Sequence, residues 1–153
     1  MSSVLEKLLV PAPRLPEEPA AGEANSELNI AVIFTSIEST LSALRTAAAL
    51  ANRLSARITL MVPQVVPFPL PLTTPPVPLD FSERRFRVLA EKSPVETTVR
   101  IYLCRNRVEA LTGALRPHSL IVIGDSRSWW PSEEKRLARQ LRRAGHEVML
   151  AGT

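Results

Sequence analysis

Residues 119–124 read Ser-Leu-Ile-Val-Ile-Gly, an apolar run that ends on a glycine. A strand followed by a glycine-rich loop and a helix is the usual device for holding phosphates on backbone N–H groups, because only glycine lets the backbone approach an anion closely. The next glycine after Gly124 is Gly145, and residues 125–131 read Asp-Ser-Arg-Ser-Trp-Trp-Pro. Bulky side chains therefore take the place of the glycines. The sequence predicts a nucleotide-binding scaffold whose nucleotide site has been lost or rebuilt.

Composition indicates an ordinary globular protein with a basic body. The chain has 153 residues, of which 45% are hydrophobic, and a formal net charge of +4. This length fits one domain with a core of normal size. Residues 1–26 hold two of the 19 basic and four of the 15 acidic residues, so the remainder carries +6. A basic body attracts phosphates or acidic partners.

Cysteine and histidine are scarce in this chain. Cys104 is the single cysteine, and only His118 and His146 accompany it, so neither a disulfide framework nor a zinc-ligand spacing is present. The apolar stretch at 4–10 is interrupted by charged residues and does not resemble a signal peptide. No run approaches the roughly 18 apolar residues of a membrane span. We therefore expect a cytoplasmic protein that does not insert into membranes.

The first 26 residues differ in composition from the rest. Residues 11–24 hold four prolines and three glutamates, which cannot form a packed core. We expect residues 1–26 to form a flexible leader and residues 27–153 to form the folded domain. Within the leader, residues 3–10 are expected to be either a frayed terminus or one or two amphipathic helical turns that dock elsewhere.

Apolar runs alternate with helical periodicity from residue 28 onward. Strands are expected at 28–34, 56–62, 96–104, 120–124 and 147–151, and helices at 39–54, 82–92, 107–115 and 132–144. This order predicts an α/β fold, a three-layer, doubly wound, five-stranded parallel sheet. The third strand alternates polar with apolar residues and is expected at an edge. The first, second and fourth strands are apolar throughout and are expected at the centre.

A proline-rich segment separates the second strand from its helix. Residues 63–78 contain seven prolines, with Phe68, Leu70 and Leu72 among them. Such a segment favours extended polyproline geometry and cannot pair as an inner strand. It is expected to be a stiff loop over the open end of the sheet, with a lid or a partner-binding segment as the alternative.

The order and spacing of these elements resemble the universal stress protein family. The best local matches are residues 44–62, Leu-Arg-Thr-Ala-Ala-Ala-Leu-Ala-Asn-Arg-Leu-Ser-Ala-Arg-Ile-Thr-Leu-Met-Val, and residues 119–124 with the preceding helix at 108–115. The likeness covers about residues 28–151. It implies the strand order 3-2-1-4-5 of universal stress proteins and of adenine nucleotide alpha hydrolase-like domains.

The resemblance also identifies where ATP-binding members of the family would hold their ligand. These members carry an aspartate at the end of strand one, and the matching residue here is Thr35. A hydroxyl replaces one hydrogen bond but not the charge. Adenine is recognised by backbone groups at the end of strand two, at a position that falls on Val62 or Pro63. If Pro63 occupies it, the N–H donor is missing.

The phosphate loop departs furthest from the family pattern. In the family, a glycine after strand four is followed by another three residues on and by a Gly-Ser or Gly-Thr pair ten residues later. Gly124 matches the first position, Arg127 falls on the second, and Leu-Ala at 137–138 falls on the pair. Side chains there would stand where phosphate oxygens meet backbone N–H groups. The resemblance therefore implies the subgroup that binds no ATP, and we expect no cofactor.

The last predicted helix carries further candidate features. Ser132 is expected to cap it, and the two glutamates that follow would repel a phosphate. Its basic residues are expected to form a solvated face, with a docking surface for an acidic protein or nucleic acid as the alternative. One of Trp129 and Trp130 is expected to anchor the loop and the other to be exposed at an interface. Nucleic-acid binding is disfavoured, because the sequence shows neither helix-turn-helix spacing nor a stacking aromatic set.

No catalytic constellation is recognised in the sequence, so the protein is not expected to be an enzyme. We expect a non-catalytic stress-response domain that acts through protein association, as a homodimer through the last strand and with a regulatory protein as a further partner. The alternative is a nucleotide or small-anion sensor, with ATP or AMP as ligand, whose remodelled pocket contains Thr35, Gly124, Ser126 and Arg127.

Overall fold

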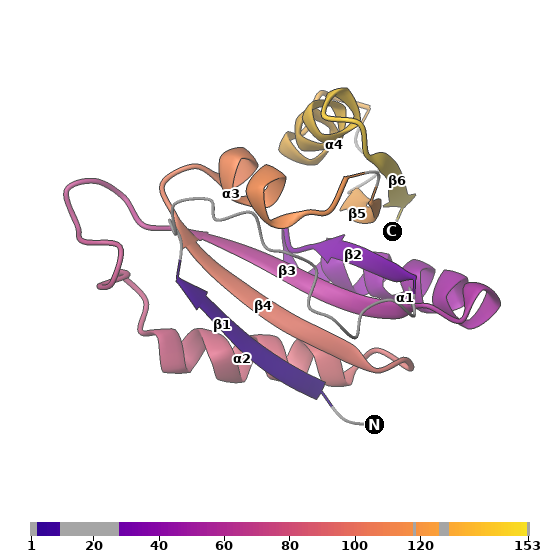
Figure 1. The fold of residues 1–153 in the computed structure, drawn as a ribbon, viewed down its shortest axis with the longest axis horizontal. Helices are drawn as coiled ribbons and strands as arrows, with labels where there is room; N and C mark the ends of the chain where they lie inside the picture. The colour runs from indigo at the N-terminus through magenta and orange to yellow at the C-terminus, as the bar shows by residue number, and fades with distance from the viewer. Residues whose placement is uncertain (1–2, 10–27, 118, 126–128, 153) are drawn as a thin grey trace.

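A computed structural model describes residues 3–9, 28–117, 119–125 and 129–152. These residues form one parallel sheet with helices on both faces (Figure 1). The sheet order is β1-β4-β3-β2-β5-β6. The strands are β1 (Ser3–Leu9), β2 (Asn29–Ile33), β3 (Arg57–Val65), β4 (Thr97–Cys104), β5 (Leu120–Asp125) and β6 (Glu147–Gly152). The helices are α1 (Ile37–Leu54), α2 (Leu79–Glu91), α3 (Arg107–Ala114) and α4 (Glu133–Arg143).

The predicted doubly wound topology is confirmed. The five strands from β2 onward lie in the order β4-β3-β2-β5-β6, which is the expected 3-2-1-4-5, and all of their pairings are parallel. The strands expected at the centre, β2, β3 and β5, are interior strands. Their side chains are buried on both faces because helices cover each of them, which explains their continuous apolar sequence. Strand β3 extends to Val65, so residues 63–65, which were expected in a proline-rich segment that cannot pair as an inner strand, pair with β4.

A sixth strand departs from the sequence prediction. Residues Ser3–Leu9 were expected within a flexible leader or in helical turns, but they form β1, which pairs in parallel with β4 from Ser3↔Thr97 to Leu9↔Leu103. Residues 10–27 lie outside the described residues, so the proposed leader and the domain boundary at residue 27 stay predictions there. The strand β4, expected at an edge, therefore has a neighbour on each side.

The polar alternation in β4 has a different cause from a missing neighbour. Its half-buried residues, Thr98 and Arg100, point to one face of the sheet, while Val99 and Ile101 belong to the core on the other face. The alternation of polar and apolar residues in β4 therefore reflects one face of the strand that helices cover incompletely.

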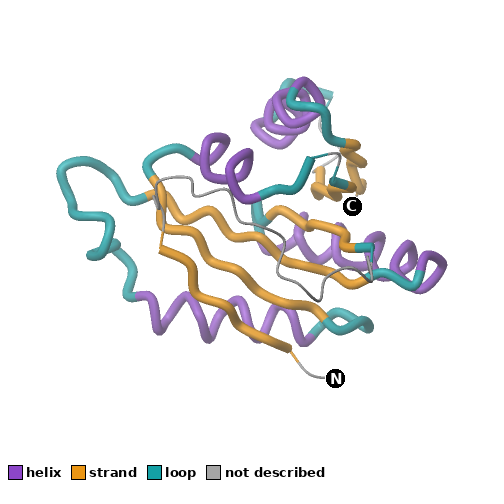
Figure 2. The backbone as a smooth tube through the Cα atoms, in the orientation of Figure 1, coloured by secondary structure: helices purple, strands orange, loops and turns teal. Residues whose placement is uncertain are grey.

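Two layers of helices enclose the sheet, as the tube view shows (Figure 2). The cluster on one face combines residues of α1 and α2 with β2, β3 and β4 side chains such as Leu60. The cluster on the other face combines α3 and α4 with the opposite sides of the same strands, including Leu111 and Leu141. Three helices begin at side-chain caps, because Ser36, Asn106 and Ser132 each accept a hydrogen bond from the third residue beyond. The predicted cap at Ser132 is confirmed.

Helix α1 lies unusually close to strand β5. A Cβ built on Gly124 would lie 1.8 Å from the backbone oxygen of Ser39, in the first turn of α1. Only a residue without a side chain fits between the end of β5 and this turn. This contact holds the start of α1 against the carboxyl edge of the sheet, where the candidate site lies.

Candidate functional site

The carboxyl ends of β2 and β5 meet where the strand order reverses. The chain runs from β2 outward to β3 and β4, and then returns to the other side of β2 with β5 and β6. Ligands of open parallel sheets bind at this switch point, outside the strand ends. The structure places Thr35 and Gly124 here, after β2 and at the end of β5, on two directly paired strands. Ser126 and Arg127, the other predicted site residues, lie outside the described residues.

The side-chain oxygen of Thr35 has no hydrogen-bond partner at this switch point. The backbone N–H of Thr35 donates to the Thr40 hydroxyl, with 3.3 Å between nitrogen and oxygen, which ties the strand end to the first turn of α1. Its own Oγ1 is buried and has no hydrogen-bond partner in the structure. A buried hydroxyl without a partner costs free energy, so this oxygen is a candidate contact for a ligand or a water molecule.

Strand β3 offers no backbone donor to the crevice at Pro63. Met61 accepts a hydrogen bond from the Phe34 N–H across to β2, at 2.9 Å. Because residues two apart in a strand direct their peptide groups to the same side, Pro63 also faces the β2 side, beyond the point where β2 ends. An ordinary residue would present an N–H there, and proline has none. The predicted loss of this adenine-recognition donor is therefore consistent with the geometry.

Two cationic side chains at this edge contact carboxylates of the same chain. Lys135 in α4 lies 3.8 Å from Asp125 at the end of β5, and Arg107 at the start of α3 lies 3.8 Å from Glu133 at the start of α4, measured from nitrogen to oxygen. Asp125 is buried, and one of its carboxylate oxygens has no hydrogen-bond partner. Sequence reasoning missed both pairs, because each depends on how the helices are brought together.

Cys104 is the last residue of β4, at the same carboxyl edge of the sheet. Its thiol is buried and donates to the Gln64 carbonyl oxygen at 3.8 Å from the sulfur. Burial raises the pKa of the Cys104 thiol, and the positive charge of Arg107 opposes that shift in part. A neutral, enclosed thiol is a packing residue rather than a nucleophile.

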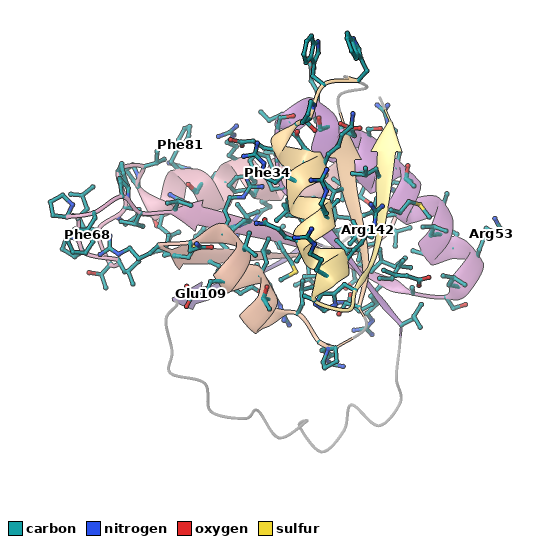
Figure 3. The ribbon with its side chains drawn as sticks, turned by 90° about the horizontal axis from the view of Figure 1, so that it is seen from above. Phe34, Arg53, Phe68, Phe81, Glu109 and Arg142 are labelled. Atoms are coloured by element: carbon teal, nitrogen blue, oxygen red, sulfur yellow. The ribbon has the colours of Figure 1, made fainter. Side chains whose placement is uncertain are left out.

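An open apolar groove lies beside α2, on the face of the sheet that α1 and α2 cover. Its volume is about 470 Å³, and its lining consists of Ile37, Phe81, Arg84, Arg85, Val88, Leu89 and Lys92. Phe81 and Val88 are more than half exposed, at 53% and 55%, and Ile37 is 43% exposed. Phe81 projects away from the ribbon in Figure 3. These exposed apolar side chains make the groove a candidate interaction surface.

Arginine and aromatic contacts shape the inner wall of this groove. Phe34, at the end of β2, packs edge to face on Phe86 of α2 with ring centroids 4.8 Å apart. The Arg85 guanidinium carbon lies 5.8 Å from the Phe34 centroid and 5.6 Å from that of Phe86. These contacts fix the orientation of Arg85 at the groove while its charge is retained.

The tryptophan pair differs from its prediction. One indole was expected to be buried against the sheet, but Trp129 is 82% exposed and Trp130 is 63% exposed. The two rings lie against each other, with centroids 4.6 Å apart and planes inclined by 32°. Beside them, a hollow of about 340 Å³ is lined by Trp129, Pro131, Ser132, Lys135, Arg136 and Arg139.

Metal and membrane features are not found in the part of the chain that the structure describes. Within it, no three His, Cys, Asp or Glu side chains cluster in a way that could hold a metal ion. None of the helices described is long and apolar enough to cross a membrane. His146, the histidine among the described residues, is buried and accepts a hydrogen bond on Nδ1 from the Ser119 N–H, with 3.2 Å between the two nitrogens.

Solved structures share this architecture. A protein of the universal stress protein family from Burkholderia pseudomallei matches at 24% identity over 80% of this chain and 93% of its own, with a TM-score of 0.57. UspA from Lactobacillus plantarum matches at 14% identity over 81% and 97%, with a TM-score of 0.54. A universal stress protein from Archaeoglobus fulgidus matches at 15% identity over 81% and 93%, with a TM-score of 0.52.

The chain has the universal stress protein fold. The likeness predicted from its sequence is thus confirmed at the level of architecture. No family model matches the sequence, and no curated protein matches it either. Because the sequence identity to these structures is low, the shared fold establishes the scaffold but not the chemistry of the site.

Proposed function

We propose that this chain is a non-catalytic, universal stress protein-like domain that acts through protein association in a stress response and leaves ATP unbound. The association surface rests on one observation, the exposed apolar groove of Ile37, Phe81 and Val88 beside α2. A complex that covers such a patch is stabilised by roughly 25 cal/mol for each Å² of apolar surface that it buries.

The chemistry of the crevice supports the absence of ATP. A triphosphate needs backbone N–H groups and cations that are free to meet its oxygens. Here Lys135 and Arg107 already lie beside the carboxylates of Asp125 and Glu133. Gly124 is the one glycine of the expected loop, and the other loop positions carry side chains. Phosphate binding would therefore have to displace carboxylates and bring negative charge close to buried Asp125.

The groove indicates the chemistry of the partner. Arg84, Arg85 and Lys92 line it, and none of its lining residues is acidic. Phe81 and Val88 are seven residues apart, which places them on one face of α2 about 10 Å from each other. Two anchors at this spacing fit the i and i+7 positions of an amphipathic helix in a groove. We propose a regulatory protein that presents a helix with apolar and acidic residues.

Affinity capture from the native host with quantitative mass spectrometry tests this proposal. The double variant Phe81→Ser/Val88→Ser should lose the proteins that the unmodified chain retains by about tenfold or more. Leu54→Ser is the matched control, because Leu54 is an exposed apolar residue at the far end of α1 and outside the groove. Equal recovery by all three chains would refute association through this surface.

Calorimetry and thermal unfolding with ATP and AMP test the proposed lack of ligand. We expect no heat of binding and no change in melting temperature at millimolar nucleotide. A ligand present at about 100 times its dissociation constant stabilises the folded state by about 2.7 kcal/mol, so real binding would be visible as a shift of several degrees.

Self-association through β6 is part of the proposal, since β6 ends the sheet. Glu147 donates its N–H to the Ser119 carbonyl on the β5 side, so Val148, Leu150 and Gly152 direct their peptide groups outward. The Val148 carbonyl accepts from Arg142 at 2.8 Å and the Gly152 carbonyl from Ser42 at 2.8 Å. A homodimer through this edge would exchange these two side-chain bonds for bonds between strands. A cytoplasmic, reducing setting, consistent with the single buried Cys104, completes the proposal.

A small-anion sensor at the switch point is the second candidate. The observation that favours it is the pair of buried polar atoms without hydrogen-bond partners, Thr35 Oγ1 and Arg107 Nη2. Titration with inorganic phosphate and with AMP, followed by amide chemical shifts of Thr35 and Gly124, tests it. Saturable shifts at both residues that Arg107→Gln abolishes would support a sensor, and unchanged spectra up to millimolar ligand would eliminate it.

A further inference from the structure

The exposed tryptophan pair and the arginines of α4 form a continuous surface, which we call the Trp–Arg surface. Its members are Trp129, Trp130, Lys135, Arg136, Arg139 and Arg143. It lies apart from the α2 groove, because α4 covers the opposite face of the sheet (Figure 1). The protein association proposed above does not use it.

Two exposed indoles are unusual on a soluble surface. Trp129 and Trp130 are the two tryptophans of the chain, and each exposes well over half of its side chain. They contact each other, and the ring of Trp129, the more exposed of the two, can receive a third planar group on the face that Trp130 does not cover. The backbone beneath them is held in place, since Lys135 Nζ donates to the Trp130 carbonyl oxygen at 3.5 Å. The pair is therefore a stacking platform attached to the start of a helix.

The hollow beside the platform is cationic. Trp129, Arg136 and Arg139 line it together, and none of the described residues in its lining carries a carboxylate. Lys135 is directed in part toward Asp125, so the two arginines supply the charge that faces solvent. A ligand that fills this hollow must combine a flat ring, to lie on the indole, with a negative group that two guanidinium groups can hold.

The cationic row continues beyond the hollow. Arg136, Arg139 and Arg143 are all exposed and follow each other at i, i+3 and i+7, which places them on one face of α4 over about 10 Å. A single phosphate would occupy only one end of this row. A chain of phosphates that carries one base per unit would use its whole length.

We propose that the Trp–Arg surface binds single-stranded nucleic acid. Bases stack on the Trp129 ring, which Trp130 supports from its other side, while the backbone phosphates follow the arginines of α4. Sequence-tolerant binders of single strands combine these two elements, an aromatic platform and a positive track. This proposal reverses the expectation from sequence, which disfavoured nucleic acid because no stacking aromatic set was recognised. The structure supplies that set.

The concave shape of the site distinguishes it from a membrane anchor. A bilayer takes up apolar side chains that project on their own, with cations above them at the headgroups. Here an indole and two arginines share the walls of one hollow, so a ring inserted there meets both kinds of group at once. Double-stranded DNA has its bases stacked inside and cannot offer them to the platform, so it should bind more weakly than a single strand.

Titration with a fluorescein-labelled oligothymidylate of about 15 nucleotides tests the proposal. The unmodified chain should raise the anisotropy of the oligonucleotide, and its own tryptophan emission should be quenched, since both indoles belong to the site. Trp129→Ala should weaken binding about fivefold or more. Arg136→Gln/Arg139→Gln should weaken it about tenfold and reduce the slope of log K against log salt by about 1.4.

Two controls separate this site from general attraction to a basic protein. The double variant Arg53→Gln/Arg87→Gln removes the same charge from exposed residues of α1 and α2 that line neither pocket and should leave affinity within about twofold. Duplex DNA of the same length should bind at least about tenfold more weakly. If the control variant loses as much affinity as Arg136→Gln/Arg139→Gln, or if the duplex binds equally well, the proposal is wrong.

Two further probes decide between single strands and other ligands. AMP should quench tryptophan emission only at concentrations far above those of the oligonucleotide, because it uses one end of the arginine row. Vesicles of phosphatidylcholine with one-quarter phosphatidylglycerol should neither bind nor shift the emission to the blue. A blue shift with vesicles together with no anisotropy change with the oligonucleotide would replace this proposal with a membrane surface.

Discussion

Gly124 packs so closely on Ser39 that a Cβ at residue 124 would overlap the Ser39 backbone carbonyl. The glycine at the end of β5 therefore has a packing role that needs no phosphate. This explains how the first glycine of the family pattern is present in a chain that has none of the others. The residue keeps α1 seated on the sheet, and its retention says nothing about nucleotide binding.

Gly124→Ala should destabilise the fold by about 2–4 kcal/mol, because the clashing atoms are backbone and cannot rotate away. Gly113→Ala is the matched control. Nothing lies within 4 Å of a Cβ at residue 113, which is in α3, so alanine should stabilise the protein by up to about 1 kcal/mol. Urea unfolding of the two variants measures both effects, and equal free energies would contradict the packing role.

Removing the hydroxyl of Thr35 and removing that of Thr40 should have different effects on the free energy of unfolding. Thr35→Val replaces a buried oxygen that has no partner, so the free energy of unfolding should stay the same or rise by up to about 1 kcal/mol. Thr40→Val leaves the Thr35 N–H without its acceptor and should cost about 1–3 kcal/mol. Chemical denaturation of both variants checks this. A large loss for Thr35→Val would show that its hydroxyl has a function in the fold.

Arg142→Ala should favour self-association through β6. The guanidinium of Arg142 holds the outward-facing Val148 carbonyl, and its removal leaves a free acceptor on the edge strand. Sedimentation velocity across a concentration series should show a larger dimer fraction for Arg142→Ala than for Arg143→Ala, the neighbouring control that leaves the Val148 bond intact. A smaller dimer fraction would mean that Arg142 itself contributes to the interface.

Cys104 should react slowly with alkylating reagents. Burial raises the pKa of its thiol, so at pH 8 the folded chain should react with iodoacetamide at least about tenfold more slowly than the chain unfolded in urea. Above the ordinary thiol pKa of about 8.5, the unfolded state releases a proton that the folded state retains, so stability should fall as pH rises. Cys104→Ala should lack this component of the pH dependence. Equal alkylation rates in both states would contradict the burial.

The spatial order of the five main strands was implied by the resemblance to universal stress proteins and is confirmed. The sequence predicted the strands themselves and their alternation with helices well, because the hydrophobic period differs between strands and helices. It could not predict β1, whose seven residues include a glutamate and a lysine at 6–7 and pair with a strand far away in the chain. The local sequence pattern indicates which residues can form a strand, whereas pairing with a distant strand depends on the tertiary structure.

The site was predicted in part. Thr35 and Gly124 were placed correctly at the strand ends, because the ends of parallel strands follow from the topology. The contacts between Arg107 and Glu133 and between Lys135 and Asp125 could not be read from the sequence, since they depend on the approach of α3 to α4. The exposure of both tryptophans was missed for a similar reason, because apolar character alone predicts burial.

The position of β1 affects how the chain matures on the ribosome. Of the described strands, β1 is synthesised before all the others, and it pairs with β4, which is synthesised about 90 residues later. Until then β1 lacks the strand that it pairs with in the folded chain, and its backbone N–H and C=O groups can pair with any extended segment nearby. The time taken to translate the residues between β1 and β4 should therefore influence whether β1 pairs within its own sheet or with that of a neighbouring polypeptide.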